Sequence, residues 1–87
     1  MKVQRKNLNG ATEIFTFGVP VEKFLVKNFS DNDIFVNFET IGDDTTTSIK
    51  IPSKIAQTII YNEYGGGVHE NLYVKGTGEV EVQALLW

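Results

Sequence analysis

The chain has 87 residues, the length of one small domain, and we expect residues 1–87 to form a single domain. It contains no cysteine, which excludes disulfides and thiolate-bound metals. The net charge is −3 and the eight Lys and Arg residues are scattered, which argues against nucleic-acid binding. No apolar run approaches the ~20 residues of a membrane-spanning helix, so we expect no membrane insertion.

The first part of the chain predicts two strands joined by a tight turn. Asn9-Gly10 lies between residues 2–8 and 11–17, and this dipeptide is typical of a two-residue β-hairpin. Gly18-Val19-Pro20 then predicts the end of the second strand, because glycine and proline interrupt regular structure.

The middle of the chain alternates with a period of two. Three apolar residues, Ile34, Val36 and Phe38, alternate with Phe35, Asn37 and Glu39. Ile49 and Ile51 flank Lys50. This period predicts strands with one face on a core. The polar run 30–33 separates the strand at 23–29 from the strand at 34–39.

Residues 53–61 allow two interpretations. Ser53 could cap a short helix that carries Ala56, Ile59 and Ile60 on one side. The β-branched residues of this segment favour a strand instead.

The last part of the chain predicts a loop and two strands. Residues 62–71 are polar and contain Gly65-Gly66-Gly67, which predicts a mobile loop. Gly76-Thr77-Gly78 predicts a turn into a final strand with Val80, Val82, Ala84 and Leu86 on its inner face. The chain as a whole predicts an all-β, antiparallel fold of about eight short strands, either a β-sandwich of jelly-roll or immunoglobulin type or a small barrel.

The aspartates allow two interpretations, as calcium ligands or as turn formers. Asp31 and Asp33 share one turn, and Asp43 and Asp44 share another. An EF-hand starting at Asp31 fails, because Phe35 and Gly42 occupy positions that require ligands. Calcium between neighbouring loops stays open, but aspartates in turns commonly bond their own backbone.

The sequence predicts no catalytic site, no cofactor and no metal site. His69 is the single histidine, and neither a nucleophile nor an orienting group can be assigned to it from spacing. Gly65-Gly66-Gly67 lacks the Lys-Ser/Thr that follows in a phosphate-binding loop. We therefore expect a protein that is not an enzyme.

Two groups of residues are candidates for contact with a partner. Tyr61, Tyr64 and Tyr73 lie beside or near the glycine-rich loop, where tyrosine suits protein or carbohydrate contact. Leu85 and Trp87 point away from the inner face of the last strand, so that its end is apolar on both sides. Either another subunit covers these two residues, or the N-terminal strand or the 18–22 connection of the same chain covers them.

Three stretches resemble small virion-associated proteins of tailed phages and prophages of Gram-positive bacteria. They are 26–36 (VKNFSDNDIFV), 49–52 (IKIP) and 72–83 (LYVKGTGEVEVQ), within a resemblance that covers about residues 22–87. The resemblance implies a compact β-sandwich encoded among head and tail genes. It carries over no functional residue, because these proteins have no catalytic motif.

These observations lead to one functional expectation and one alternative. We expect a non-enzymatic structural protein, a head-decoration, fibre or tail-associated module that forms a homo-oligomer or docks on other virion proteins. The basic N-terminal residues are followed by no apolar segment, so we expect it in the host cytoplasm during assembly and then in the virion. The alternative is a β-sandwich that binds a cell-surface glycan.

Overall fold

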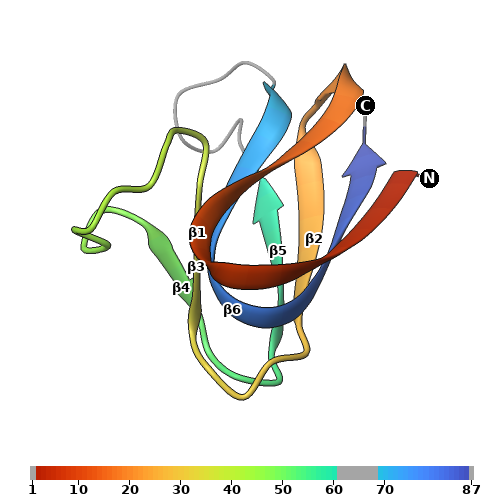
Figure 1. Cartoon of the computed structure of the whole chain (residues 1–87). Coiled ribbons are helices and arrows are strands. Elements are labelled where there is room, and N and C mark those ends of the chain that lie inside the picture. The colour runs from red at the N-terminus through yellow and green to blue at the C-terminus, as the bar shows by residue number, and fades with distance from the viewer. Residues whose placement is uncertain (1, 61–68, 87) are drawn as a thin grey trace.

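The computed structural model describes residues 2–60 and 69–86, and these residues form an antiparallel sheet that is nearly closed into a barrel (Figure 1). The described strands are β1 (Lys2–Val21), β2 (Lys23–Asn28), β3 (Ile34–Asn37), β4 (Ile49–Ile51), β5 (Ala56–Ile60) and β6 (His69–Leu86). The described residues form no helix, and so none that is long and apolar enough to span a bilayer. The expectation of an all-β, antiparallel fold is confirmed.

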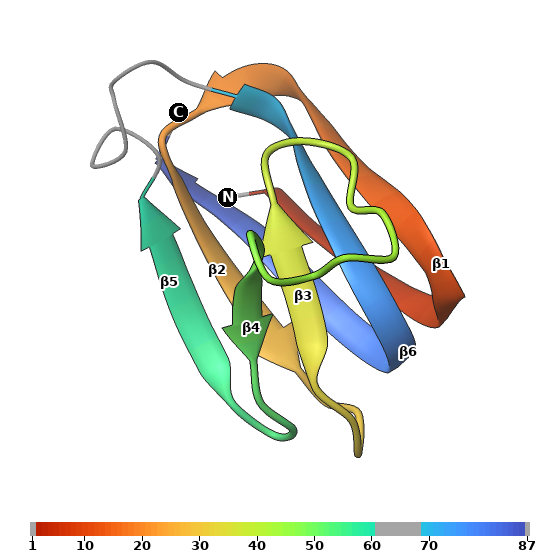
Figure 2. The same cartoon turned by 90° about the vertical axis from the view of Figure 1, so that its left-hand side faces the viewer.

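Strand β6 organises the sheet, because three of the five pairings between described strands involve it. The strand order is β4-β3-β6-β2-β5, and β1 runs along the opposite side of β6. The first half of β6 pairs with β3 through Phe35↔Lys75, and the second half pairs with β2 through Val26↔Val82. The two halves therefore belong to two faces that fold over a common core (Figures 1 and 2).

Strands β1 and β6 bend together at glycines. The residues Gly10 and Ala11 of β1 lie opposite Gly76 alone, so β1 carries one extra residue, a β-bulge. Gly10 has a φ of 96° and Gly78 a φ of 111°, which L side chains rarely adopt. A Cβ on Gly76 would lie 2.8 Å from Cγ2 of Ile34, so glycine also lets β3 approach β6 closely.

Three predicted breaks between strands are therefore wrong, and the expected β-sandwich of about eight strands is not confirmed. Residues 2–8 and 11–17 do not pair as a hairpin at Asn9-Gly10; both belong to β1 and both pair with β6. Gly76-Thr77-Gly78 lies inside β6, and β1 continues past Gly18 to Val21. Gly10, Gly18 and Gly78 do adopt a positive φ, but they do so within a long strand and not in a turn between two strands. The segment 53–61 contains β5, as the strand interpretation predicted.

The core is built from the inward residues of each strand. Phe15 and Phe17 on β1, Phe24 and Val26 on β2, and Val80, Val82 and Ala84 on β6 are all buried, as the alternation predicted. Burial of a large apolar side chain stabilises the fold by roughly 1.5–3 kcal/mol each. Not every phenylalanine follows this pattern: Phe29, in the turn after β2, is 40% exposed.

Candidate functional site

Leu85 lies near the end of β6, where β6 carries one more residue than β2: Lys23 and Phe24 lie opposite Leu86 and Ala84, and Leu85 is the extra residue. Its inward neighbour Ala84 is fully buried, whereas Leu85 is half-buried. Gln83, two residues before Leu85, lies opposite Val3 on one side and Leu25 on the other. Val3 is 48% exposed. Val3, Leu25 and Leu85 thus surround Gln83, and we call these three residues the apolar patch.

A row of charged residues borders the apolar patch. Arg5, Glu81 and Lys27 lie directly opposite one another on β1, β6 and β2. The guanidinium of Arg5 donates hydrogen bonds to Oε1 of Glu81, at 2.6 Å from the terminal nitrogen and 3.2 Å from Nε. Nζ of Lys27 lies 3.5 Å from Oε2. Glu81 is only 5% exposed although it faces outward, because these long side chains cover it.

The carboxylate of Glu81 is a structural anion. The hydrogen bond from Arg5, followed by a 2.7 Å bond from Nε2 of Gln83, lowers the pKa of Glu81 from its ordinary value. Both of its oxygens accept hydrogen bonds from neighbouring side chains. A general acid or base needs a carboxyl group that can exchange its proton with a substrate, and this geometry holds Glu81 ionised instead.

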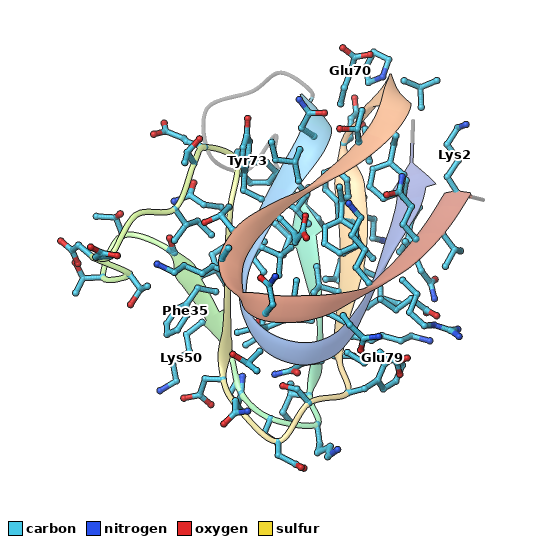
Figure 3. All side chains as sticks on the ribbon, viewed as in Figure 1. Lys2, Phe35, Lys50, Glu70, Tyr73 and Glu79 are labelled. Atoms are coloured by element: carbon cyan, nitrogen blue, oxygen red, sulfur yellow. The ribbon has the colours of Figure 1, made fainter. Side chains whose placement is uncertain are left out.

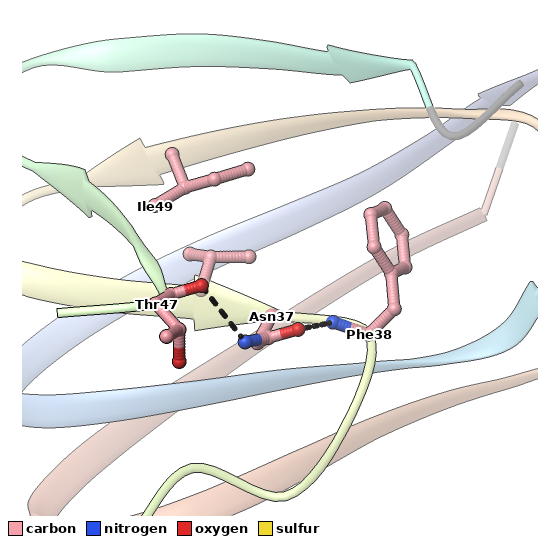
Figure 4. Close-up of a pocket in the computed structure, with 5 residues that line it drawn as sticks. Asn37, Phe38, Thr47 and Ile49 are labelled. Carbon is pink, nitrogen blue, oxygen red and sulfur yellow. Dashed lines mark hydrogen bonds between the residues drawn. The ribbon is translucent and has the colours of Figure 1, made fainter. Parts of the chain in front are cut away.

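The pocket at the end of β3 is small and largely apolar (Figure 4). It has a volume of about 230 Å³ and is lined by Val36, Asn37, Phe38, Thr47 and Ile49. Phe38 and Ile49 pack against the core, and the ring of Phe38 lies 6.2 Å from that of Phe24. This volume is below the range typical of ligand and cofactor sites. Its uncharged lining suits a single apolar side chain.

The side-chain amide of Asn37, which lines the pocket, forms hydrogen bonds with residues of the loop after β3. Oδ1 of Asn37 accepts a hydrogen bond of 2.7 Å from the backbone N–H of Phe38. Nδ2 of Asn37 donates to the carbonyl of Thr47 at 3.4 Å (Figure 4). It also donates to Oγ of Ser48 at 3.2 Å. The amide of Asn37 therefore orders the loop.

Tyr73 lies on the outer face of the other half of the sheet (Figure 3). It is half-buried, whereas Leu72 and Val74 on either side are fully buried, so Tyr73 points outward as predicted. It lies opposite Asn37, and Phe35, two residues before Asn37, is its diagonal neighbour on the same face. Two aromatic rings, those of Phe35 and Tyr73, thus lie on this face.

The loop between β3 and β4 crosses the same face (Figure 2). Oγ1 of Thr12 donates to the carbonyl of Ile41 at 2.7 Å, and Nζ of Lys75 donates to the carbonyl of Gly42 at the same distance. Ile41 is 5% exposed. This loop therefore restricts access to the outer face beside Tyr73.

The remaining candidate residues are only partly within the described structure. Tyr61, Tyr64 and Trp87 lie outside the described residues, as does most of the predicted loop 62–71. His69 begins β6. The structure thus brings Leu85 together with Val3 and Leu25, two residues that the sequence interpretation did not select. Each has a charged residue two positions along the chain, Arg5 for Val3 and Lys27 for Leu25, and this was a usable signal, because residues two apart share one face of a strand.

The aspartates engage neighbouring groups of the protein. Oδ1 of Asp44 accepts hydrogen bonds from the backbone N–H and Oγ1 of Thr46, and these bonds lower the pKa of Asp44. Asp31 lies 3.3 Å from Nζ of Lys54, and Asp33 lies 3.6 Å from Nζ of Lys50. Among residues 2–60 and 69–86, no group of three or more His, Cys, Asp or Glu side chains could hold a metal ion.

The described part of the chain is an all-β, antiparallel fold whose surface carries the apolar patch beside a row of paired charges. Comparison of the chain with protein-family models, with curated proteins and with solved structures finds no match. The support for a function therefore comes from the surface of the protein and from the resemblance of 26–36, 49–52 and 72–83 to virion-associated proteins.

Proposed function

We propose that this chain is a non-enzymatic structural protein of a phage or prophage particle, a head-decoration, fibre or tail-associated module that acts through protein–protein contacts. The observation that carries the proposal is the apolar patch of Val3, Leu25 and Leu85. Apolar residues that cluster on an outer sheet face, beside a polar border, are typical of surfaces that another protein covers.

The charged border supports the same role. Glu81 is neutralised by Arg5 and Lys27, so a partner approaching the patch meets charges that are already paired within the sheet. Charges paired in advance reduce the cost of desolvation on binding, because each has a partner before water leaves. The resemblance of 26–36, 49–52 and 72–83 to virion-associated proteins supports a phage or prophage particle as the assembly that contains this protein.

The test is the composition of purified particles. We expect the protein in particles produced by the phage or prophage that carries its gene, and we expect Leu85→Ser and Val3→Ser to reduce its incorporation at least tenfold. Ile14→Ser is the matched control, because Ile14 is 44% exposed on β1 but lies away from the patch. Absence of the wild-type protein from particles would contradict the proposal, as would equal losses for Ile14→Ser.

A second candidate function is binding of a cell-surface glycan. The observation that favours it is the outward position of Tyr73 with Phe35 as its diagonal neighbour, because sugars stack on such rings. The crossing loop anchored by Thr12 and Lys75 weighs against it. A glycan-array screen of wild type and Tyr73→Ala separates the two candidates: binding that Tyr73→Ala removes supports this one, and silence of the wild type rejects it.

A further inference from the structure

Strand β5 is an edge of the sheet that carries no charge. In the described structure it pairs with β2 alone, through residues Lys23–Lys27 of that strand. Its sequence is AQTII, and Ala56, Gln57 and Thr58 are exposed. Natural proteins protect edge strands with charged residues, prolines or bulges, because an exposed edge accepts another strand. Strand β5 has none of these devices.

The direction of the free backbone groups of β5 follows from one hydrogen bond. The N–H of Asn28 donates to the carbonyl of Ile55 at 3.0 Å, in register with the β2–β5 ladder. Bonding positions alternate along an antiparallel ladder, so Gln57 and Ile59 also bond to β2. Ala56, Thr58 and Ile60 therefore direct their N–H and C=O groups toward the free edge.

The other described edges are protected. Nε2 of Gln4 donates to the carbonyl of Thr16, and Nζ of Lys6 donates to the carbonyl of Ile14, so the two halves of β1 cover each other's edge. Strand β4 has three residues, and its central Lys50 lies near Asp33. Protection is thus present on β1 and β4 and missing on β5.

We propose that two copies of this chain pair their β5 strands antiparallel about a two-fold axis at Thr58. This arrangement places Thr58 opposite itself, Gln57 opposite Ile59 of the second copy, and Ala56 opposite Ile60 of the second copy. The small Ala56 then faces the larger Ile60, and no like charges oppose each other, so the strand is complementary to itself.

Continuity with the apolar patch favours a second copy over an unrelated peptide. The cross-strand row Val3–Gln83–Leu25 continues to Thr58. The two-fold axis at Thr58 therefore joins the rows of two copies into one continuous outer face with an apolar patch on each side. This inference rests on the proposed role as an assembly subunit and names one partner, a second copy of the chain.

The pairing edge is short, so the dimer is expected to be weak. An interface below about 1,200 Å² is typical of transient association, and we expect a Kd on the order of 0.1 mM. The monomer mass is 9.7 kDa. In sedimentation velocity, the wild-type mass should rise from this value toward twice it as the concentration increases to about 1 mM, a range that brackets this Kd.

Charge exchange at the two-fold axis tests the geometry. Thr58→Lys and Thr58→Glu should each remain monomeric, because like charges then face each other, and an equimolar mixture should recover the dimer. Thr16→Lys is the matched control, since Thr16 is exposed on β1 and the change in charge is the same. It should dimerise like the wild type.

Hydrogen exchange of the wild type gives a readout that needs no variant. The N–H groups of Ala56, Thr58 and Ile60 should exchange at least fivefold more slowly at high concentration than at low concentration. A wild type that stays monomeric to about 1 mM overturns the inference. So does a Thr58→Lys variant that dimerises normally, or a mixture without recovery. A dimer that persists in a protein absent from particles supports this inference and contradicts the proposed phage function.

Discussion

Asn28 and Ser30 are joined by two hydrogen bonds to one atom: Oδ1 of Asn28 accepts from the backbone N–H of Ser30 at 2.9 Å and from its Oγ at 2.7 Å. Nδ2 of Asn28 donates to the carbonyls of Asn32, Ile51 and Pro52 at 2.8–3.1 Å. Asn28 is 2% exposed. One amide therefore ties the turn after β2 to the end of β4.

Replacement of Asn28 should destabilise the fold strongly. Asn28→Ala leaves the buried polar groups around it without their partner, and we expect a loss of about 2–4 kcal/mol in the free energy of unfolding. Urea denaturation measures this loss. Ser53→Ala is the control, because Ser53 gives one partly buried bond to the carbonyl of Ser30, and it should cost about 1 kcal/mol or less. Equal losses for the two variants would contradict the central role of Asn28.

Three glycine-to-alanine variants should follow a graded order of stability. Gly42→Ala should be nearly neutral, since a Cβ there meets nothing within 4 Å. Gly10→Ala also meets open space but has a φ of 96°, so we expect a cost of about 1–2 kcal/mol. Gly78→Ala should cost more than either, because the φ is 111° and the new Cβ would collide with Ser30. Thermal melting gives the order, and a Gly10→Ala variant as stable as the wild type would show that the bend does not need glycine.

Acid should weaken the contribution of Glu81. Its pKa in the folded state lies below its ordinary value of 4.5, so its ionised form stabilises the fold above that pH. This contribution is lost as the pH falls through the lowered pKa. Glu81→Gln should therefore lower the melting temperature more at pH 7 than at pH 3. Glu79→Gln is the control, since Glu79 is exposed on the same strand. A deficit of the Glu81→Gln variant that is independent of pH would count against this linkage.

Calcium should leave the stability unchanged. The side chains of Asp31 and Asp33 lie near lysines, and Asp44 accepts two hydrogen bonds from Thr46. A ligand that binds only the folded state raises the melting temperature by mass action. We expect melting curves in calcium and in EDTA to agree within about 1 °C. A rise of several degrees in calcium would restore the hypothesis of a cation site between loops.

The sequence by itself determined the class of the fold and the facing of most strand residues. Alternation placed Val80, Val82 and Ala84 inward, and the structure confirms that all three are buried. These features are local, because successive side chains of a strand point to opposite faces whatever its partner is. The requirement for glycine at position 10 is local as well, since it follows from the backbone conformation of one residue.

Only the tertiary structure decided which strand segments pair with one another. Asn9-Gly10 suits either a hairpin turn or a bulge in a long strand, and the choice depends on whether 2–8 pairs with 11–17 or with β6. Pairing with β6 lets both long strands curl around one core. The apolar patch, the row at Glu81 and the free edge of β5 all depend on register between distant segments. Register is set by the total burial of the folded chain, which no short stretch of sequence contains.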